Sequence, residues 1–363
     1  MTEIVLDPYE RLAETLNKIP NGFPMAEDGI HIRILKWIYT PEEADLASKM
    51  KLIGETSEEL SSRLNIPLEG LTEKLERMTD KGQIRTTDTS TGRRFAIFPF
   101  VVGILEEQVD RMDAELAQIM EEYLHKTVGK ADLFEVEPPI LKIIPINRVI
   151  DSKLTIHTYE QLEQIINQSK SWGVRECICK KQQALLKNPC KYPKTVCLTF
   201  SSRENAYNEH TISKPTTKKQ ALELLQQAEE AGLIHCSMNI QSGHYYICNC
   251  CTCCCGVLRG LTERNQPFAF VKANFIMSVD EELCTGCGTC VDRCQFSALD
   301  VPEEICEVNL QRCVGCGVCA ISCPEEALNL VRRHPLEPEP PVTIRDWMTQ
   351  KAMSRQVDPS DLL

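Results

Sequence analysis

Two four-cysteine runs with the same spacing constrain this chain more than any other feature of its sequence. They are "CTGCGTCVDRC" (284–294) and "CVGCGVCAISC" (313–323), and each follows the pattern C-x2-C-x2-C-x3-C. Three thiolates separated by two residues can wrap around three irons of one cubane cluster, and the glycines between them let backbone amides approach the sulfurs. The fourth cysteine of each run then points to the other cluster. Tetrahedral zinc needs ligand pairs on separated turns, so the doubled run argues against zinc here.

The doubled run resembles the bacterial two-cluster ferredoxin over about 55 residues. The resemblance implies two [4Fe–4S] clusters in a bacterial ferredoxin-like domain. One departure from the family pattern is Gln295, which follows Cys294, whereas Pro324 follows Cys323. Residue 295 is not a ligand, so the departure affects local backbone shape rather than binding. The resemblance assigns Cys284, Cys287, Cys290 and Cys323 to one cluster, and Cys313, Cys316, Cys319 and Cys294 to the other.

All 20 cysteines lie from Cys177 to Cys323, and twelve of them are not ferredoxin ligands: eleven lie upstream of the two runs and one lies between them. Cys306 lies between the two ferredoxin halves and is expected to be a buried thiol that is not a ligand. Ten of the eleven upstream cysteines form two dense runs, "CICKKQQALLKNPCKYPKTVC" (177–197) and "ICNCCTCCCG" (247–256), and Cys236 is isolated between them. We expect these runs together to hold one or two further iron–sulfur clusters, because reduced thiolates this dense beside a ferredoxin domain favour metal binding. The predicted ligands are Cys177, Cys179, Cys190, Cys197, Cys248, Cys250, Cys251, Cys253 and Cys255.

The second dense run has six cysteines in eight residues. If it is extended, its side chains alternate between two faces, with Cys248, Cys250 and Cys254 on one and Cys251, Cys253 and Cys255 on the other. Geometry therefore argues against six thiols on one cubane. Redox-active thiols, a zinc site, or a bound subset with free neighbours are the alternatives. Residues 254–256 (CCG) resemble the non-cubane cluster sites of heterodisulfide-reductase-like subunits.

The front of the chain has helical patterns. "HIRILKWIY" has apolar residues at helical spacing, and capping boxes at Thr40 and Thr56 predict two more helix starts. "PLEGLTEKLERMTDKG" predicts a helix with Leu68 on its apolar face, and "IRTTDTSTGRRFAIF" predicts a hairpin. This order resembles a winged-helix domain over roughly 30–100. A single long helix is expected over 104–125, with packing favoured over a dimeric coiled coil.

The middle of the chain mixes element types. Helices are predicted over 158–170, with a Thr158/Gln161 capping box, and over 218–231, with Gly232 as the stop. "LIHCSMNI" and "HYYIC" predict strands. The fold class is therefore α+β and multidomain. We expect a helical, winged-helix-like domain with a long helix (1–135), a mixed α/β cysteine-rich domain (136–276), a two-cluster ferredoxin domain (277–334) and an extended tail (335–363).

Composition and charge limit the cellular compartment and the binding partners that we expect for this protein. The start of the chain has no pattern of a signal peptide, and the longest apolar run, 95–105, is too short to span a bilayer. We therefore expect a cytoplasmic protein with reduced thiols. The net charge of −12 disfavours nonspecific binding to nucleic acid or to anionic membrane.

Several short stretches resemble a group of anaerobic-type bacterial and archaeal iron–sulfur proteins. They are the ferredoxin runs, "PNGFP" (20–24), "WGVRECICK" (172–180) and "ICNCCTC" (247–253). The resemblance implies the domain architecture, but it does not identify a partner.

Three functions fit these features. The favoured one is electron transfer by a subunit or redox partner of a larger oxidoreductase, since no dinucleotide-binding motif is visible. An iron–sulfur-sensing winged-helix regulator is the second, although the candidate recognition helix has more acids than bases. The third is a reductase whose active site lies in the cysteine-rich middle. No catalytic residue is assigned, because His235 and His244 near that region are expected to be simply hydrogen-bonded. The donor, the acceptor and the oligomeric state are left open.

Overall fold

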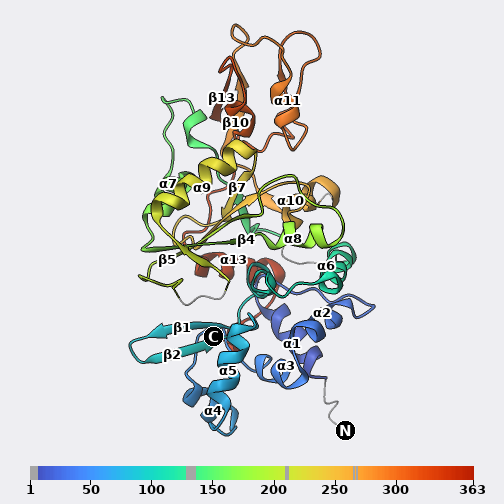
Figure 1. Cartoon of the computed structure of the whole chain (residues 1–363), viewed down its shortest axis with the longest axis vertical. Coiled ribbons are helices and arrows are strands. Elements are labelled where there is room, and N and C mark those ends of the chain that lie inside the picture. Colours follow the sequence, from blue (N-terminus) through green and yellow to red (C-terminus); the bar gives the residue numbers. More distant parts are fainter. Residues whose placement is uncertain (1–6, 128–135, 209–211, 265, 267–268) are drawn as a thin grey trace. The chain divides into compact units, whose positions relative to one another are not determined.

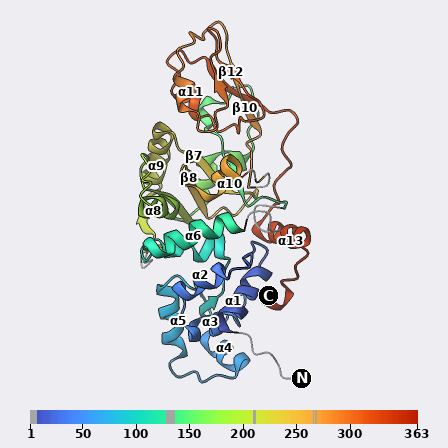
Figure 2. The same ribbon diagram turned by 90° about the vertical axis from the view of Figure 1, so that its right-hand side faces the viewer.

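The computed structural model of this chain describes residues 7–127, 136–208, 212–264, 266 and 269–363 (Figures 1 and 2). It is a mixed α+β structure that divides into two compact units. Unit 1 comprises Met1–Glu137, Lys181–Asn188 and Met348–Leu363, and unit 2 comprises Pro138–Lys180 and Pro189–Trp347. The four-domain division expected from the sequence stays a prediction.

Unit 1 begins with helices and continues into a hairpin. The predicted capping boxes are confirmed: Thr40 and Glu43 cap α3, and Thr56 and Glu59 cap α4. The predicted hairpin is also confirmed, because β1 and β2 pair antiparallel. The elements are α1 (Pro8–Lys18), α2 (Ile30–Ile38), α3 (Pro41–Ala47), α4 (Ser57–Leu64), α5 (Leu71–Asp80), β1 (Arg85–Thr89), β2 (Gly92–Ala96), η1 (Phe100–Ile104), η2 (Glu106–Gln108) and α6 (Ala114–Lys126). The winged-helix assignment remains a prediction.

Two expectations for this unit are wrong. The long helix expected over 104–125 is interrupted, and only α6 is a regular α-helix in that stretch. Asp113 adopts extended backbone, and its carboxylate accepts a hydrogen bond from the Leu116 amide at 2.9 Å, so a new helix starts there. Leu68 does not belong to the apolar face of α5 either, since the helix starts at Leu71 and Leu68 is exposed.

Unit 2 is built on a mixed sheet with the strand order β6-β4-β5-β8-β7-β3-β9. Each neighbouring pair is antiparallel except β3–β9. The strands are β3 (Leu141–Ile143), β4 (Ser171–Glu176), β5 (Thr195–Ser201), β6 (Lys214–Thr216), β7 (Ile234–Met238), β8 (Tyr246–Cys250) and β9 (Phe270–Val271). The helices around it are η3 (Asn147–Val149), η4 (Thr158–Glu160), α7 (Leu162–Asn167), α8 (Ile178–Leu185), whose first turn belongs to this unit, α9 (Lys218–Ala231) and α10 (Gly256–Arg264).

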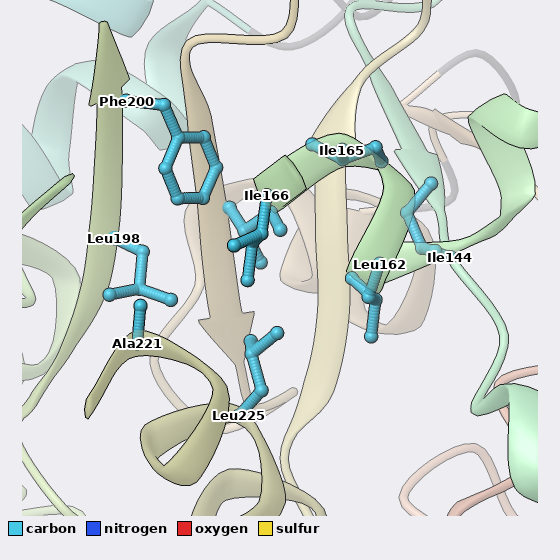
Figure 3. Close-up of a cluster of buried hydrophobic side chains, with 9 residues drawn as sticks. Ile144, Leu162, Ile165, Ile166, Leu198, Phe200, Ala221 and Leu225 are labelled. Carbon is cyan, nitrogen blue, oxygen red and sulfur yellow. The ribbon is translucent and has the colours of Figure 1, made fainter. Parts of the chain in front are cut away.

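Helices α7 and α9 pack on one face of this sheet (Figures 1 and 3). The apolar cluster between these helices and the sheet is made of Ile144, Leu162, Ile165, Ile166, Leu198, Phe200, Ala221, Leu225 and Ile247.

Two helices of this unit were predicted from the sequence. The predicted bounds of α9 are confirmed, including Gly232 in the left-handed conformation as its C-cap. The single helix expected over 158–170 is wrong: a 3-10 turn precedes the short α7, and Glu160 accepts a hydrogen bond from the His157 amide in place of a Thr158/Gln161 box.

The ferredoxin segment of unit 2 is a small two-fold repeat. Strands β10 (Phe275–Val279) and β13 (Leu328–Arg332) pair antiparallel, as do β11 (Leu299–Asp300) and β12 (Glu307–Val308). A short helix contains the third cysteine of each run, α11 (Thr289–Arg293) in the first half and α12 (Val318–Ile321) in the second. Each cysteine loop therefore leads directly into a helix.

The tail is not simply extended, contrary to the sequence-based expectation. It contains α13 (Ile344–Arg355) and the short η5 (Ser360–Leu362). Thr343 and Asp346 start α13, because the Thr343 amide donates to the Asp346 carboxylate at 2.9 Å and the Asp346 amide to the Thr343 hydroxyl at 3.4 Å. This Thr-x-x-Asp pattern is visible in the sequence and is the local signal for the helix.

Candidate metal–thiolate centres

The first ferredoxin set gathers around one hollow. Cys284, Cys287, Cys290 and Cys323 all line it, together with the glycine loop between the first three. The neighbouring Cys306 is buried, as expected, and its amide lies 3.4 Å from the Cys284 sulfur. Its own sulfur lies 3.5 Å from that of Cys290. Four soft thiolates around one hollow fit the ligand set of a [4Fe–4S] cluster.

The second ferredoxin set also comes together. Burial and the nearby charges of Cys316, Cys294 and Cys313 raise the pKa of Cys319 well above its ordinary value. The Ala298 amide donates to the Cys294 sulfur at 3.3 Å, which stabilises a thiolate there. Cys290 of the first set also contributes to the raised pKa of Cys319, so the two sets are electrostatic neighbours. Excess negative charge of this kind is relieved when thiolates bind metal.

Glycines shape both cysteine loops. Gly286 and Gly315 occupy the same position of the two runs, with φ of +66° and +73°. A Cβ at Gly286 would lie 2.4 Å from the Glu304 carbonyl oxygen, and one at Gly315 would lie 2.1 Å from that of Phe275. Both positions therefore exclude any side chain, and the glycines are needed for the shape of the loop as well as for access to the sulfurs.

The upstream cysteines are organised by the large sheet. Cys236 of β7 pairs directly with Cys248 of β8. Leu198 of β5 pairs with Ile247, which places Cys197 on the face of the sheet that bears Cys248. This face is opposite to the one that Ile247 and Leu198 present to α7 and α9. Side-chain alternation thus puts Cys197, Cys236, Cys248 and Cys250 on one side of three neighbouring strands.

Three further cysteines at helix starts complete this group. Cys177 and Cys179 lie at the start of α8, and Cys255 lies directly before α10. Each of these thiols shifts the pKa of the next, so that six of them form a closed circle of interacting groups, which we call the six-thiol ring. In order around the ring, its members are Cys177, Cys179, Cys255, Cys250, Cys248 and Cys197.

The ring favours one thiolate in the absence of metal. Hydrogen bonds from the thiols of Cys179 and Cys197 hold the pKa of Cys177 well below its ordinary value, and they raise the pKa values of the two donors. Lys180 adds to this effect through its amide and its charge. Its buried ammonium also donates to the Pro193 carbonyl at 2.7 Å and to the Asn249 carbonyl at 3.4 Å. Lys180 was not identified from the sequence, where it ends the "RECICK" stretch without a distinguishing signal.

The remaining upstream cysteines form a second, tighter group, which we call the four-thiol cluster. Its members are Cys190, Cys251, Cys253 and Cys254, whose sulfurs all lie within 4.8 Å of one another. Hydrogen bonds from Cys254, and more weakly from Cys253 and Cys190, lower the pKa of Cys251 to about 6, and the charge of Lys180 acts in the same direction. Lys180 is therefore close to thiols of both groups.

This division corrects the alternation expected over 248–255. β8 ends at Cys250, and the chain then turns, with the Cys255 amide donating to the Cys251 carbonyl at 3.0 Å. The turn brings Cys254 to the face of Cys251 and Cys253, and sends Cys255 to the face of Cys248 and Cys250. Cys254, omitted from the expected ligands, belongs to the four-thiol cluster. The Gly256 helix start was the available signal that the strand could not continue.

The two histidines of this region are hydrogen-bonded, as expected. His235 Nδ1 lies 2.6 Å from the Asn249 side-chain oxygen, and His244 Nδ1 lies 2.8 Å from the Ser237 hydroxyl. Burial lowers the pKa of His244 to about 4, so it is neutral at physiological pH. Neither histidine contacts a cysteine sulfur by a hydrogen bond that the structure records among the described residues.

Gln295, the residue that departs from the ferredoxin pattern, connects the ferredoxin segment to the cysteine-rich turn. Its side-chain oxygen accepts a hydrogen bond from the Thr252 amide at 2.8 Å, and its amide group donates to the Gly232 carbonyl at 2.5 Å. Arg293 donates to the carbonyls of Glu229 at 3.1 Å and of Ala231 at 3.3 Å, in the last turn of α9. A cation there stabilises the helix C-terminus. Proline at 295 would remove the Thr252 contact.

Comparison with known proteins supports the ferredoxin assignment. A family model described as a 4Fe-4S binding domain matches residues 277–300 and 306–329, one repeat for each cysteine run. Neither the curated proteins nor the solved structures contain a match to the chain. The chain therefore has a ferredoxin-type segment with two tandem repeats. Within the part of the chain that the structure describes, no helix combines the length and apolar character that a membrane span requires.

Proposed function

We propose that this protein transfers single electrons through iron–sulfur clusters, as a subunit or redox partner of a larger cytoplasmic oxidoreductase. Two [4Fe–4S] clusters are held by the ferredoxin cysteines, and a further cluster is held by the six-thiol ring. The observation that carries the proposal is the succession of sulfur groups within unit 2. Thiolates are the ligands that such clusters require, and closely spaced clusters pass electrons one at a time.

The order of the groups supports a conducting series. Cys290 of the first ferredoxin set lies close enough to Cys319 of the second to raise its pKa. The second set is in turn near the ring through Cys236. The hydrogen bond with Cys250 lowers the pKa of Cys236, but burial and the charges of Cys255, Cys248 and Cys316 together raise it. These contacts support a series in which the second ferredoxin set lies between the first set and the six-thiol ring.

The six-thiol ring itself supports cluster binding rather than disulfide chemistry. A ring of six thiols on one face of a sheet offers more ligands than a single ion needs, and more than one cubane needs. The chemistry that a bound cluster would supply is reversible one-electron storage. The chain contributes the thiolates, the charge of Lys180 beside Cys177, and a largely buried setting that limits access by water.

Unit 1 is proposed to bind a protein partner rather than DNA. Helix α5 has Glu73, Glu76 and Asp80 against Lys74 and Arg77. Two arginines of the hairpin face carboxylates: Arg93 lies 3.0 Å from Glu76 and from Asp88, and Arg94 lies 2.9 Å from Glu59. Little positive charge is left for phosphates. A gel-shift assay at low salt should show no specific retention of the protein's own promoter DNA, and specific retention would favour the regulator instead.

A reductive titration tests the electron-transfer proposal. The anaerobically prepared full chain should take up about three electrons, one for each cluster, in successive one-electron steps followed by electron paramagnetic resonance. The Cys197→Ser variant should take up about two and keep the ferredoxin signals. The matched control is Ile247→Val, which changes the opposite face of the sheet and should behave like the wild type. Uptake of only two electrons by the wild type would refute a redox centre in the ring.

A further inference from the structure

The four-thiol cluster has the dimensions of a site for one ion. Four of its sulfur–sulfur separations are 3.3 Å (251–253), 3.5 Å (190–251), 3.6 Å (253–254) and 3.7 Å (190–253), and all four sulfurs lie within 4.8 Å of one another. A tetrahedral ion with metal–sulfur bonds of about 2.3 Å places its ligands about 3.8 Å apart. The arrangement therefore closes around a single ion without further movement of the backbone.

The other sulfur groups are wider. Among the described residues, no other set of three or more cysteine, histidine, aspartate or glutamate side chains brings its ligand atoms within that mutual distance. Both ferredoxin sets and the six-thiol ring are thus more open than the four-thiol cluster. A cubane demands such openness, because its irons and sulfides separate the four thiolates from one another. The tight group lacks room for an inorganic core between its sulfurs.

From this contrast we propose that Cys190, Cys251, Cys253 and Cys254 bind one tetrahedral divalent ion of the zinc class, without inorganic sulfide. The site is separate from the electron-transferring clusters. Four thiolates with no open position are typical of a structural zinc site, whereas a catalytic zinc keeps one position for water. The Tyr192 amide lies 3.4 Å from the Cys190 sulfur and stabilises its thiolate.

The ion would fasten the cysteine-rich turn. Cys190 comes from the segment between α8 and β5, and the other three ligands come from the turn between β8 and α10. Cross-linking these two segments fixes the conformation of residues 251–254. The same turn directs Cys255 toward the six-thiol ring, on the side of Cys248 and Cys250. The ion thus separates two roles within one cysteine run: Cys251, Cys253 and Cys254 hold the structure of the turn, and Cys248, Cys250 and Cys255 belong to the cluster site.

Metal and sulfide analysis of the anaerobically purified full chain tests this proposal. The wild type should contain about one zinc per chain in addition to its iron. The Cys254→Ser variant should lose that zinc while iron and acid-labile sulfide stay unchanged. Thr252→Ser, in the same turn but without a thiol, is the matched control and should keep the zinc. Joint loss of iron and sulfide in Cys254→Ser, or a wild type without zinc, would overturn the assignment.

A second measurement does not depend on any variant folding. Zinc X-ray absorption of the wild-type chain should show four sulfur neighbours at about 2.3 Å and no nitrogen or oxygen shell. A shell of nitrogen or oxygen atoms would mean that zinc is bound elsewhere and would overturn the proposal. Neither experiment depends on redox activity, so failure of the ion site and failure of the electron-transfer proposal are distinguishable.

Discussion

The ferredoxin segment and the cysteine-rich sheet hold their thiols in different ways. In the ferredoxin segment, three of each four ligands come from one loop of seven residues whose glycines adopt positive φ. In the sheet, the six-thiol ring draws on β5, β8 and the starts of α8 and α10. The first arrangement is mostly local, and the second depends on strand pairing across residues 177–255. A local site can form wherever its loop forms, whereas a non-local site exists only once the sheet is assembled.

A ligand removed from the second ferredoxin set should have the largest effect on the whole series. Cys319→Ser is expected to lose about four irons and to interrupt transfer between the first ferredoxin cluster and the ring, because the proposed series has the second set between them. Iron analysis and freeze-quench electron paramagnetic resonance measure the two effects. Ser322→Ala, next to the same loop, is the control. Undiminished transfer in Cys319→Ser would show that the ring receives electrons by another route.

A side chain at Gly315 should destabilise the local site strongly. Gly315→Ala combines positive φ with a Cβ 2.1 Å from a backbone oxygen, so unit 2 should lose at least about 2 kcal/mol of unfolding free energy. Gly243 has a φ of +80° with open space around it. Gly243→Ala should therefore cost only about 1 kcal/mol. Anaerobic denaturant titrations measure both, and equal losses would contradict the steric argument.

Lys142 offers a test of the sheet that is independent of metal. Its ammonium is buried over the Tyr159 ring, 4.8 Å from the centroid, and has no hydrogen-bond partner among the described residues. Burial lowers the pKa of Lys142 from 10.5 to about 8 despite the charge of Glu160. This difference corresponds to about 3 kcal/mol against the folded state at neutral pH. Lys142→Met should therefore raise the free energy of unfolding at pH 7 by up to about 3 kcal/mol.

The sign of the pH dependence follows from the lowered pKa. Below pH 8 the lysine is charged in both states, and the full cost is present. Above pH 8 the folded chain releases its proton while the unfolded chain keeps it until about pH 10.5, so the cost disappears over that window. The difference in stability between Lys142→Met and wild type should shrink between pH 8 and 10.5. A constant difference would mean that Lys142 does not titrate as its burial implies.

The smallest effect on the free energy of unfolding is expected at Gln295, where the ferredoxin segment contacts the cysteine-rich turn. Gln295→Ala removes the hydrogen bonds to the Thr252 amide and the Gly232 carbonyl, and it should cost about 1–2 kcal/mol. Gln295→Pro restores the residue usual in ferredoxins but removes the same contacts. Both variants should keep their iron and lose similar stability in denaturant titrations. If Gln295→Pro were more stable than wild type, the contact with the turn would have no part in holding the segments together.

The two regions also differ in what could be predicted from sequence. The ferredoxin assignment rests on the spacing of Cys284–Cys294 and Cys313–Cys323, which is short enough to be informative without the fold. The bounds of α9 were predictable for the same reason, since Thr217, Gln220 and Gly232 mark its ends locally. The ring was not predictable, because neither strand order nor the turn after Cys250 is encoded in cysteine spacing. The placement of Cys254 and Cys255 was wrong because period-two alternation was extended past the end of β8.

The most direct test of the central claim is the iron and acid-labile sulfide content of the full chain, prepared without oxygen. Two ferredoxin clusters alone would give about eight irons and eight sulfides per chain. The account predicts about twelve or more of each, with the excess lost in Cys177→Ser/Cys248→Ser and the ferredoxin signals retained. A wild-type content of about eight, unchanged in that double variant, would contradict a cluster in the six-thiol ring.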